Sequence, residues 1–141
     1  MKFIGLDGKT YNLDVRQSRH PMRAEAACKS KLQYRCGQIL RKHFRVDPIL
    51  EELHIDGHGF YFDFFIPTHG IAVEINGDQH DEYNSFFYKN KRSFLEAKER
   101  DSRKESLCEM NGWALLVAKS EDDLRYLLNI PNDSEKTNDG N

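Results

Sequence analysis

The sequence predicts an α/β fold in which a mixed sheet is flanked by helices. Three runs rich in aromatic and β-branched residues follow one another between 49 and 76, as expected of consecutive strands. Two longer segments, about 23–44 and 91–110, have apolar residues at helical spacing, and a short apolar run, 113–118, follows the second. A helix, three strands, a helix and a returning strand are typical of a sheet with helices packed on its faces.

The individual elements have recognisable boundaries. A β-hairpin is expected over residues 2–15, because Asp7-Gly8 lies between two apolar runs. The three strands are predicted at Ile49–Ile55, Phe60–Ile66 and Ile71–Asn76, and Ser120 begins a last helix that reaches about residue 129. We therefore expect three parts, listed here in chain order: a hairpin with a basic connector (1–22), one globular domain (23–130) and a disordered tail (131–141).

Composition excludes several classes of protein. The 141 residues suffice for one domain, 31% of them are charged, and no apolar run approaches the roughly 20 residues of a membrane span. The sequence lacks the apolar core of a signal peptide, so we expect a cytoplasmic protein that does not enter a membrane. Three cysteines without a Cys-x-x-Cys pair argue against a disulfide framework and a zinc ribbon.

Positive charge is concentrated in one segment although the whole chain has a net charge of -2. Residues 16–45 contain nine Lys or Arg and a single acid, Glu25. Such a local surplus attracts a phosphate backbone, whereas an ordinary solvated helix face usually mixes both signs. The residues expected to contact DNA are Arg16, Arg19, Arg23, Lys29, Lys31 and Arg35.

Two acids interrupt apolar strands. In the run 60–67, FYFDFFIP, alternation places Phe60, Phe62 and Phe64 on one face and Tyr61, Asp63 and Phe65 on the other. Glu74 lies in the next strand, within IAVEIN. Residues facing each other across a hairpin lie about 5 Å apart. If both acids point to the same side, their carboxylates converge, and two buried carboxylates repel unless they share a proton or a divalent ion. Oxygen ligands favour magnesium or manganese.

Four further polar residues are candidates for the site. His80 follows the Glu74 strand in the loop Gly77-Asp78-Gln79-His80, where a general acid or base could act. Asp101 and Lys104 lie on the inward stripe of the second long helix, although an ordinary ion pair at this spacing is an equally simple interpretation. Gln33 borders the buried face of the first helix and could turn toward the sheet, to bind a metal-bound water.

At these residues the sequence resembles the PD-(D/E)XK, or restriction-endonuclease-like, nuclease superfamily, over about residues 24–119. The likeness is greatest to its very-short-patch-repair (Vsr-like) endonucleases and related (EDxHD) phage homing endonucleases, and DFFIPTHGIAVEINGDQH is its most specific part. The resemblance implies an αβββαβ core. It also implies a site formed by Asp63, Glu74, His80 and Asp101.

The resemblance implies a magnesium-dependent endonuclease acting on double-stranded DNA. Asp63, Glu74 and the main-chain carbonyl of Ile75 would hold Mg²⁺ or Mn²⁺, His80 would act on the attacking water or leaving oxygen, and Lys104 would contact the scissile phosphate. Asp101 would hold His80 or a second ion. Asn76 stands where the superfamily has a lysine, and a helix glutamate of many members is matched at best by Gln33 or Glu25. The lysine's role would pass to His80 or Lys104.

Several alternatives remain open at this point. A catalytically inactive DNA-binding module, or a nuclease acting on RNA or on branched DNA, would use the same residues. The sequence does not separate nicking from double-strand cleavage, a monomer from a homodimer, or defence, homing and repair from one another. A phage or mobile-element origin is compatible with the resemblance, and would place the protein in the cytoplasm of a bacterial host.

Overall fold

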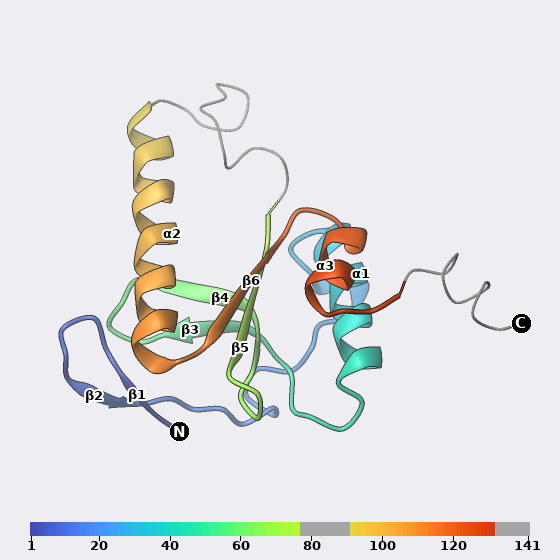
Figure 1. The fold of residues 1–141 in the computed structure, drawn as a ribbon, viewed down its shortest axis with the longest axis horizontal. Helices are drawn as coiled ribbons and strands as arrows, with labels where there is room; N and C mark the ends of the chain where they lie inside the picture. Colours follow the sequence, from blue (N-terminus) through green and yellow to red (C-terminus); the bar gives the residue numbers. More distant parts are fainter. Residues whose placement is uncertain (77–90, 132–141) are drawn as a thin grey trace, which may run out of the picture.

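A computed structural model of the chain describes residues 1–76 and 91–131 (Figure 1). The elements follow one another as listed here: β1 (Lys2–Ile4), β2 (Thr10–Asn12), a 3₁₀ turn η1 (Glu25–Ala27), α1 (Lys31–His43), β3 (Leu50–Ile55), β4 (Phe60–Ile66), β5 (Ile71–Ile75), α2 (Lys91–Asn111), β6 (Ala114–Ala118) and α3 (Glu121–Leu127). This is the mixed α/β architecture that the sequence predicts, with its N-terminal hairpin.

The main sheet has four strands in the order β3-β4-β5-β6. The first three strands are antiparallel neighbours, and β6 joins β5 in parallel after the α2 crossover. The β4–β5 ladder is short and pairs only Phe64–Ile66 with Ile71–Val73. Toward the start of β4 and the end of β5 no further ladder pair forms, which leaves room between the two strands.

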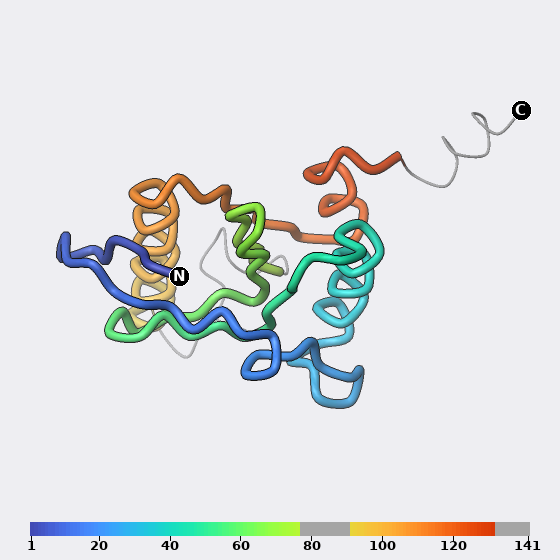
Figure 2. The backbone as a smooth tube through the Cα atoms, turned by 90° about the horizontal axis from the view of Figure 1, so that it is seen from below, coloured from blue at the N-terminus to red at the C-terminus, as the bar shows by residue number. Residues whose placement is uncertain are grey.

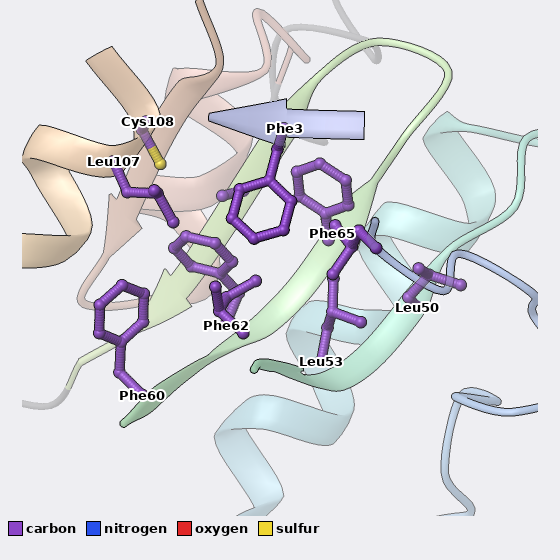
Figure 3. Close-up of a cluster of buried hydrophobic side chains, with 11 residues drawn as sticks. Phe3, Leu50, Leu53, Phe60, Phe62, Phe65, Leu107 and Cys108 are labelled. Carbon is purple, nitrogen blue, oxygen red and sulfur yellow. The ribbon is translucent and has the colours of Figure 1, made fainter. Parts of the chain in front are cut away.

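Helices cover the two faces of the sheet. Figure 2 shows α2 at one side of the molecule and α1 with α3 at the other, with the sheet between them. Leu107 and Cys108 of α2 share one apolar cluster with Phe62 and Phe65 of β4 (Figure 3). Cys36 and Leu40 of α1 share a second cluster with residues of α3 and with Phe64, Ile66 and Val73. The sheet is therefore buried on both faces in its centre.

The N-terminal hairpin packs against the α2 side of the sheet. Gly8 has φ +81°, which the Asp7-Gly8 turn requires, and Phe3 lies in the cluster of Figure 3. The Leu6 N–H donates to His58 Nε2 at 3.1 Å, which joins the hairpin to the turn between β3 and β4. The Asn111 side chain bonds both backbone groups of Ile4. The hairpin is thus fastened to the sheet and to the end of α2.

The first long helix is shorter than the sequence indicates. It begins at Lys31 rather than near Arg23, because the Ser30 hydroxyl accepts the Gln33 N–H at 3.0 Å and so caps the helix. The preceding residues form the separate turn η1, and the Arg23 N–H donates to Glu51 at 2.7 Å. The apolar spacing carries no sign of this break, since Cys28 fits the helical pattern as well as Cys36 does.

Regular alternation also fails in the middle of β4. Phe60 and Phe62 lie on the α2 side as expected, but Phe65 joins them there, and Phe64 faces α1 instead. The neighbouring strand changes phase at the same level, where Glu52 has φ +52°. This left-handed conformation is rare for a residue with a side chain and costs on the order of 1 kcal/mol or more. The alternation of side chains along β4 alone cannot reveal that two neighbouring strands change phase together.

The described residues also confirm the expected last helix. The last helix starts after Ser120, whose hydroxyl accepts the Asp123 N–H at 3.0 Å. Within the described ranges no helix has the length and apolar content to cross a membrane. Residues 77–90, which include His80, and residues 132–141, most of the expected tail, lie outside the described residues.

Gly37 gives a test of the packing between α1 and the sheet. A Cβ added there would lie 3.0 Å from Phe64 Cζ, and Phe64 is fully buried. Alanine normally stabilises a helix interior by about 1 kcal/mol relative to glycine, but overpacking a tight core costs roughly 1–3 kcal/mol. We expect Gly37→Ala to lower the free energy of unfolding by about 1 kcal/mol, measured by urea denaturation.

The exposed neighbour Gln38 supplies the control, since Gln38→Ala should change the stability by less than about 0.5 kcal/mol. A Gly37→Ala variant as stable as the wild type would show that the Phe64 ring moves to accommodate the added methyl group.

Candidate active site

A cavity of about 650 Å³ opens where β4 and β5 separate. Its walls come from the start of α1, the first half of β4, the end of β5 and the middle of α2. The polar residues in these walls include Lys29, Gln33, Asp63, Glu74, Asp101 and Lys104. The fold therefore gathers into one place polar residues that are far apart in the sequence.

Asp63 and Glu74 hold the two separating strands together. The Asp63 N–H donates to Glu74 Oε2 at 2.9 Å, and the Ile75 N–H donates to Asp63 Oδ2 at 2.8 Å. Each carboxylate thus accepts a backbone hydrogen bond from the opposite strand, just beyond the last ladder pair, Phe64 with Val73. One oxygen of each acid accepts a backbone N–H of the sheet, and the other oxygen has no backbone partner.

Two lysines neutralise these two acids. Lys29, just ahead of α1, places its ammonium 3.2 Å from Asp63 Oδ1, and Lys104 of α2 contacts Glu74 Oε1. The Asp63 and Glu74 side chains are 7% and 8% exposed, so an uncompensated charge on either would be costly. Each acid therefore has a cation of its own.

Burial and neighbouring charges shift the pKa values of Glu74 and Lys29. Loss of water, and then the negative charge of Asp63, raise the pKa of Glu74 to about 7, although Lys104 acts in the opposite direction. Burial disfavours the Lys29 ammonium, but the charge of Asp63, the Tyr61 hydrogen bond and Glu52 outweigh it and raise the pKa of Lys29 above its usual range. Lys29 is therefore fully charged at neutral pH.

A third carboxylate lies in the same row. Glu51 of β3 pairs with Phe64 and Leu53 pairs with Phe62, so Glu52 lies at the level of Asp63. Glu74 follows Val73, the partner of Phe64, so the three acids lie at about the same level of three neighbouring strands. Glu52 is buried, and its Oε1 lies 3.5 Å from the Lys29 ammonium. Our sequence reasoning missed this residue, although Glu51-Glu52 interrupts an apolar strand just as Asp63 and Glu74 do.

Gln33 connects this row to α1. It is buried, turns toward the sheet, and donates its side-chain N–H groups to Glu51 at 2.9 Å and to Glu52 at 3.2 Å. The left-handed backbone at Glu52 explains how two consecutive strand residues can face the same glutamine. The direction expected for Gln33 is correct, and its partners are carboxylates of β3.

Tyr61 is a second residue that sequence reasoning did not single out. Its hydroxyl accepts from Lys29 at 2.7 Å, and its ring centroid lies 4.3 Å from the Lys29 ammonium and 5.5 Å from that of Lys104. An aromatic ring attracts cations at such distances. Tyr61 thus helps to hold both lysines beside their acids.

A smaller groove of about 240 Å³ meets the cavity from the side of β6. Both spaces share Glu74, Asn76, Asp101 and Lys104. Asp101 and Lys104 therefore do lie on the inward stripe of α2, as the spacing predicts, and Asn76 reaches the cavity as well. Ile75 lies in the wall of the larger cavity, whereas His80 is outside the described residues.

The basic residues expected to bind DNA have different surroundings. Arg16 and Arg19 form ion pairs with Asp14, at 2.8 and 3.7 Å, and Arg35 pairs with Glu121 of α3. Lys29 turns into the cavity, while Arg23 and Lys31 are exposed. Part of the positive surplus of the segment is therefore balanced locally, which a sequence count cannot show.

The donor set fits a hard divalent cation. Among the described residues no group of three or more His, Cys, Asp or Glu side chains is arranged to enclose a metal. Magnesium, however, usually takes one or two carboxylates and keeps several waters. Asp63 Oδ1 and Glu74 Oε1 are the oxygens without backbone bonds, and each now contacts a lysine ammonium, which a divalent cation would have to displace or adjoin.

Comparison with known proteins shows a viral relative of this chain. The chain is similar to Uncharacterized protein 033L of Invertebrate iridescent virus 3, with 35% identity over 92 residues. The matched part covers 62% of this chain and 47% of the viral protein, so the chain spans about half the length of that relative. No protein-family model and no solved structure matches the chain. The activity must therefore be inferred from the chemistry of the cavity.

Proposed function

We propose that this chain is a magnesium-dependent endonuclease that hydrolyses DNA phosphodiester bonds, by nicking or by cutting both strands. The observation that carries the proposal is the pair of buried carboxylates, Asp63 and Glu74. Both line one cavity, and each has one oxygen that accepts no backbone hydrogen bond. The order of helix, three antiparallel strands, helix and parallel strand supports a restriction-endonuclease-like core.

The metal would be bound by Asp63 and Glu74, with the Ile75 carbonyl as a third oxygen, and Mn²⁺ could replace Mg²⁺. Bound magnesium would supply an activated water and would neutralise charge that develops on the phosphate. Both effects serve phosphodiester hydrolysis, in which a dianionic centre forms beside the metal ligands.

The chain's own residues would complete the chemistry. Lys104, which lines the cavity and contacts Glu74, would contact the scissile phosphate. His80, four residues beyond Asn76, would orient or deprotonate the attacking water or protonate the leaving oxygen. Asp101 would hold His80 or a second ion. Gln33, whose side-chain N–H groups bond Glu51 and Glu52, would hydrogen-bond a metal-bound water.

Double-stranded DNA would approach the basic segment 16–45, which includes α1. The residues proposed to contact phosphates are Arg16, Arg19, Arg23, Lys29, Lys31 and Arg35. Such contacts position a duplex without reading its sequence, and their strength falls steeply with salt.

One observation favours a second candidate, a DNA-binding module without catalysis. Both carboxylates are already neutralised by lysines, and Asn76 lines the cavity where the superfamily has a lysine. A chain that had lost its metal could keep this arrangement for structural reasons alone. A nuclease that acts on RNA or on branched DNA would use the same cavity as the proposed enzyme.

A plasmid assay separates these functions. Supercoiled DNA incubated with the protein and Mg²⁺ or Mn²⁺ should become nicked or linear, and a chelator should prevent this because the carboxylates then lack their cation. A gel shift without cleavage under every condition would support the binding module. Cleavage of RNA or branched DNA, with intact plasmid, would change the substrate but keep the chemistry.

The two carboxylates can be tested by nearly isosteric changes. Asp63→Asn and Glu74→Gln should each abolish cleavage and preserve DNA binding, since each removes a charged metal ligand and leaves the basic residues of segment 16–45 unchanged. Cleavage is measured on plasmid, binding by gel shift, and folding by circular dichroism. Asp122→Asn, on the exposed side of α3, is the matched control and should cleave normally. Wild-type cleavage by either site variant would remove that acid from the mechanism.

His80→Ala should lower the cleavage rate by about a hundredfold or more, because a positioned general acid or base contributes on this scale. The measurement is a single-turnover rate at saturating Mg²⁺. His69→Ala provides a control, since His69 is half-exposed and bonds Asp47 instead of cavity residues. A near-normal rate for His80→Ala would make it an ordinary loop histidine.

A further inference from the structure

Lys29 lies at the mouth of the cavity and has three polar partners there. Its ammonium is 2.7 Å from the Tyr61 hydroxyl, 3.2 Å from Asp63 Oδ1 and 3.5 Å from Glu52 Oε1. The lysine side chain is 47% exposed, whereas those of Asp63 and Glu52 are 7% and 9% exposed. A partly solvated cation therefore lies between two buried anions, whose combined charge exceeds its own.

The position of this ammonium conflicts with that of a bound metal. Asp63 Oδ2 accepts the Ile75 N–H, so Oδ1, the oxygen that Lys29 contacts, is the one without a backbone bond. A divalent cation that binds Oδ1 would come within a few ångström of the ammonium, where two positive charges repel strongly even in a partly solvated site. Lys29 and the metal therefore compete for the same oxygen.

The two lysines of the site differ in their freedom to move. The Lys104 side chain is 12% exposed and is enclosed between α2 and β5, whereas nearly half of Lys29 is in contact with solvent. Glu52 and Tyr61 also give Lys29 partners that it can keep after it leaves Asp63. Lys29 can therefore withdraw without becoming an unpaired cation.

We propose that the Lys29 ammonium occupies the position of the divalent cation at Asp63 and is displaced when the cation binds. Glu52 and Tyr61 then retain the displaced ammonium at the edge of the cavity. The inference rests on the proposed function, since it takes Asp63 and Glu74 as the cation site. The released ammonium would remain at the partly solvated edge of the cavity, where it would be accessible to a DNA phosphate. Metal binding would thus make Lys29 available to the substrate.

The test is the affinity of the full chain for Mn²⁺ without DNA, measured by electron paramagnetic resonance of the free ion. Lys29→Met removes the competing charge and keeps much of the side-chain volume, so it should tighten Mn²⁺ binding by about tenfold, given the strength of partly solvated charge interactions. Lys42→Met makes the same charge change on the exposed far end of α1 and should leave the affinity within about twofold.

The outcomes separate the two proposals. Wild-type binding of Mn²⁺ with unchanged or weaker binding by Lys29→Met and by a second neutral variant, Lys29→Gln, would overturn the competition and leave the proposed nuclease intact. No Mn²⁺ binding by the wild type, with circular dichroism showing a folded chain, would overturn the cation site and this inference together.

The role of Glu52 is tested by a double-mutant cycle. Glu52→Gln deprives Lys29 of its second acid, so the ammonium should hold Asp63 more firmly and Mn²⁺ binding should weaken several-fold. In the Lys29→Met background the same change should weaken Mn²⁺ binding much less, because Glu52 is a positioning residue that acts mainly through Lys29. An equal loss in both backgrounds would instead make Glu52 a direct ligand and would overturn its proposed role.

Discussion

The structure depends on neutralising two carboxylates where β4 and β5 separate. Asp63 and Glu74 each accept a backbone N–H from the other's strand, so they replace the ladder hydrogen bonds that the separating strands lose. The same residues thus close the sheet and line the cavity. Because an uncompensated buried charge is very costly, the surrounding elements must bring cations to these two positions.

The two long helices meet that requirement from opposite sides. The Ser30 cap fixes where α1 begins, so Lys29 lies just outside the helix and can reach Asp63, while Gln33, in the first turn, faces Glu51 and Glu52. From the other side, α2 carries Lys104 to Glu74. Tyr61 lies near both ammonium groups, and its ring and hydroxyl connect the two ion pairs.

Local strain is found at the same level of the sheet. Glu52 adopts a left-handed backbone, and regular alternation breaks in β3 and β4 together, which directs Glu51 and Glu52 to the same glutamine. Residues in such conformations persist only where their surroundings compensate the cost, and they are often found at functional sites. Here the compensation is a set of buried hydrogen bonds around a row of three acids.

The sequence by itself determined the order of elements, the hairpin turn at Asp7-Gly8 and the anomaly of Asp63 and Glu74, because periodicity and isolated charges in apolar strands are local features. It also placed Asp101 and Lys104 on the inward stripe of α2. Tertiary structure decided the start of α1, the side of the sheet on which Phe64 and Phe65 lie, and the partners of Lys29 and Gln33. These depend on a helix cap, on a paired break in two strands and on contacts between residues distant in the chain, which no local pattern of side chains can encode.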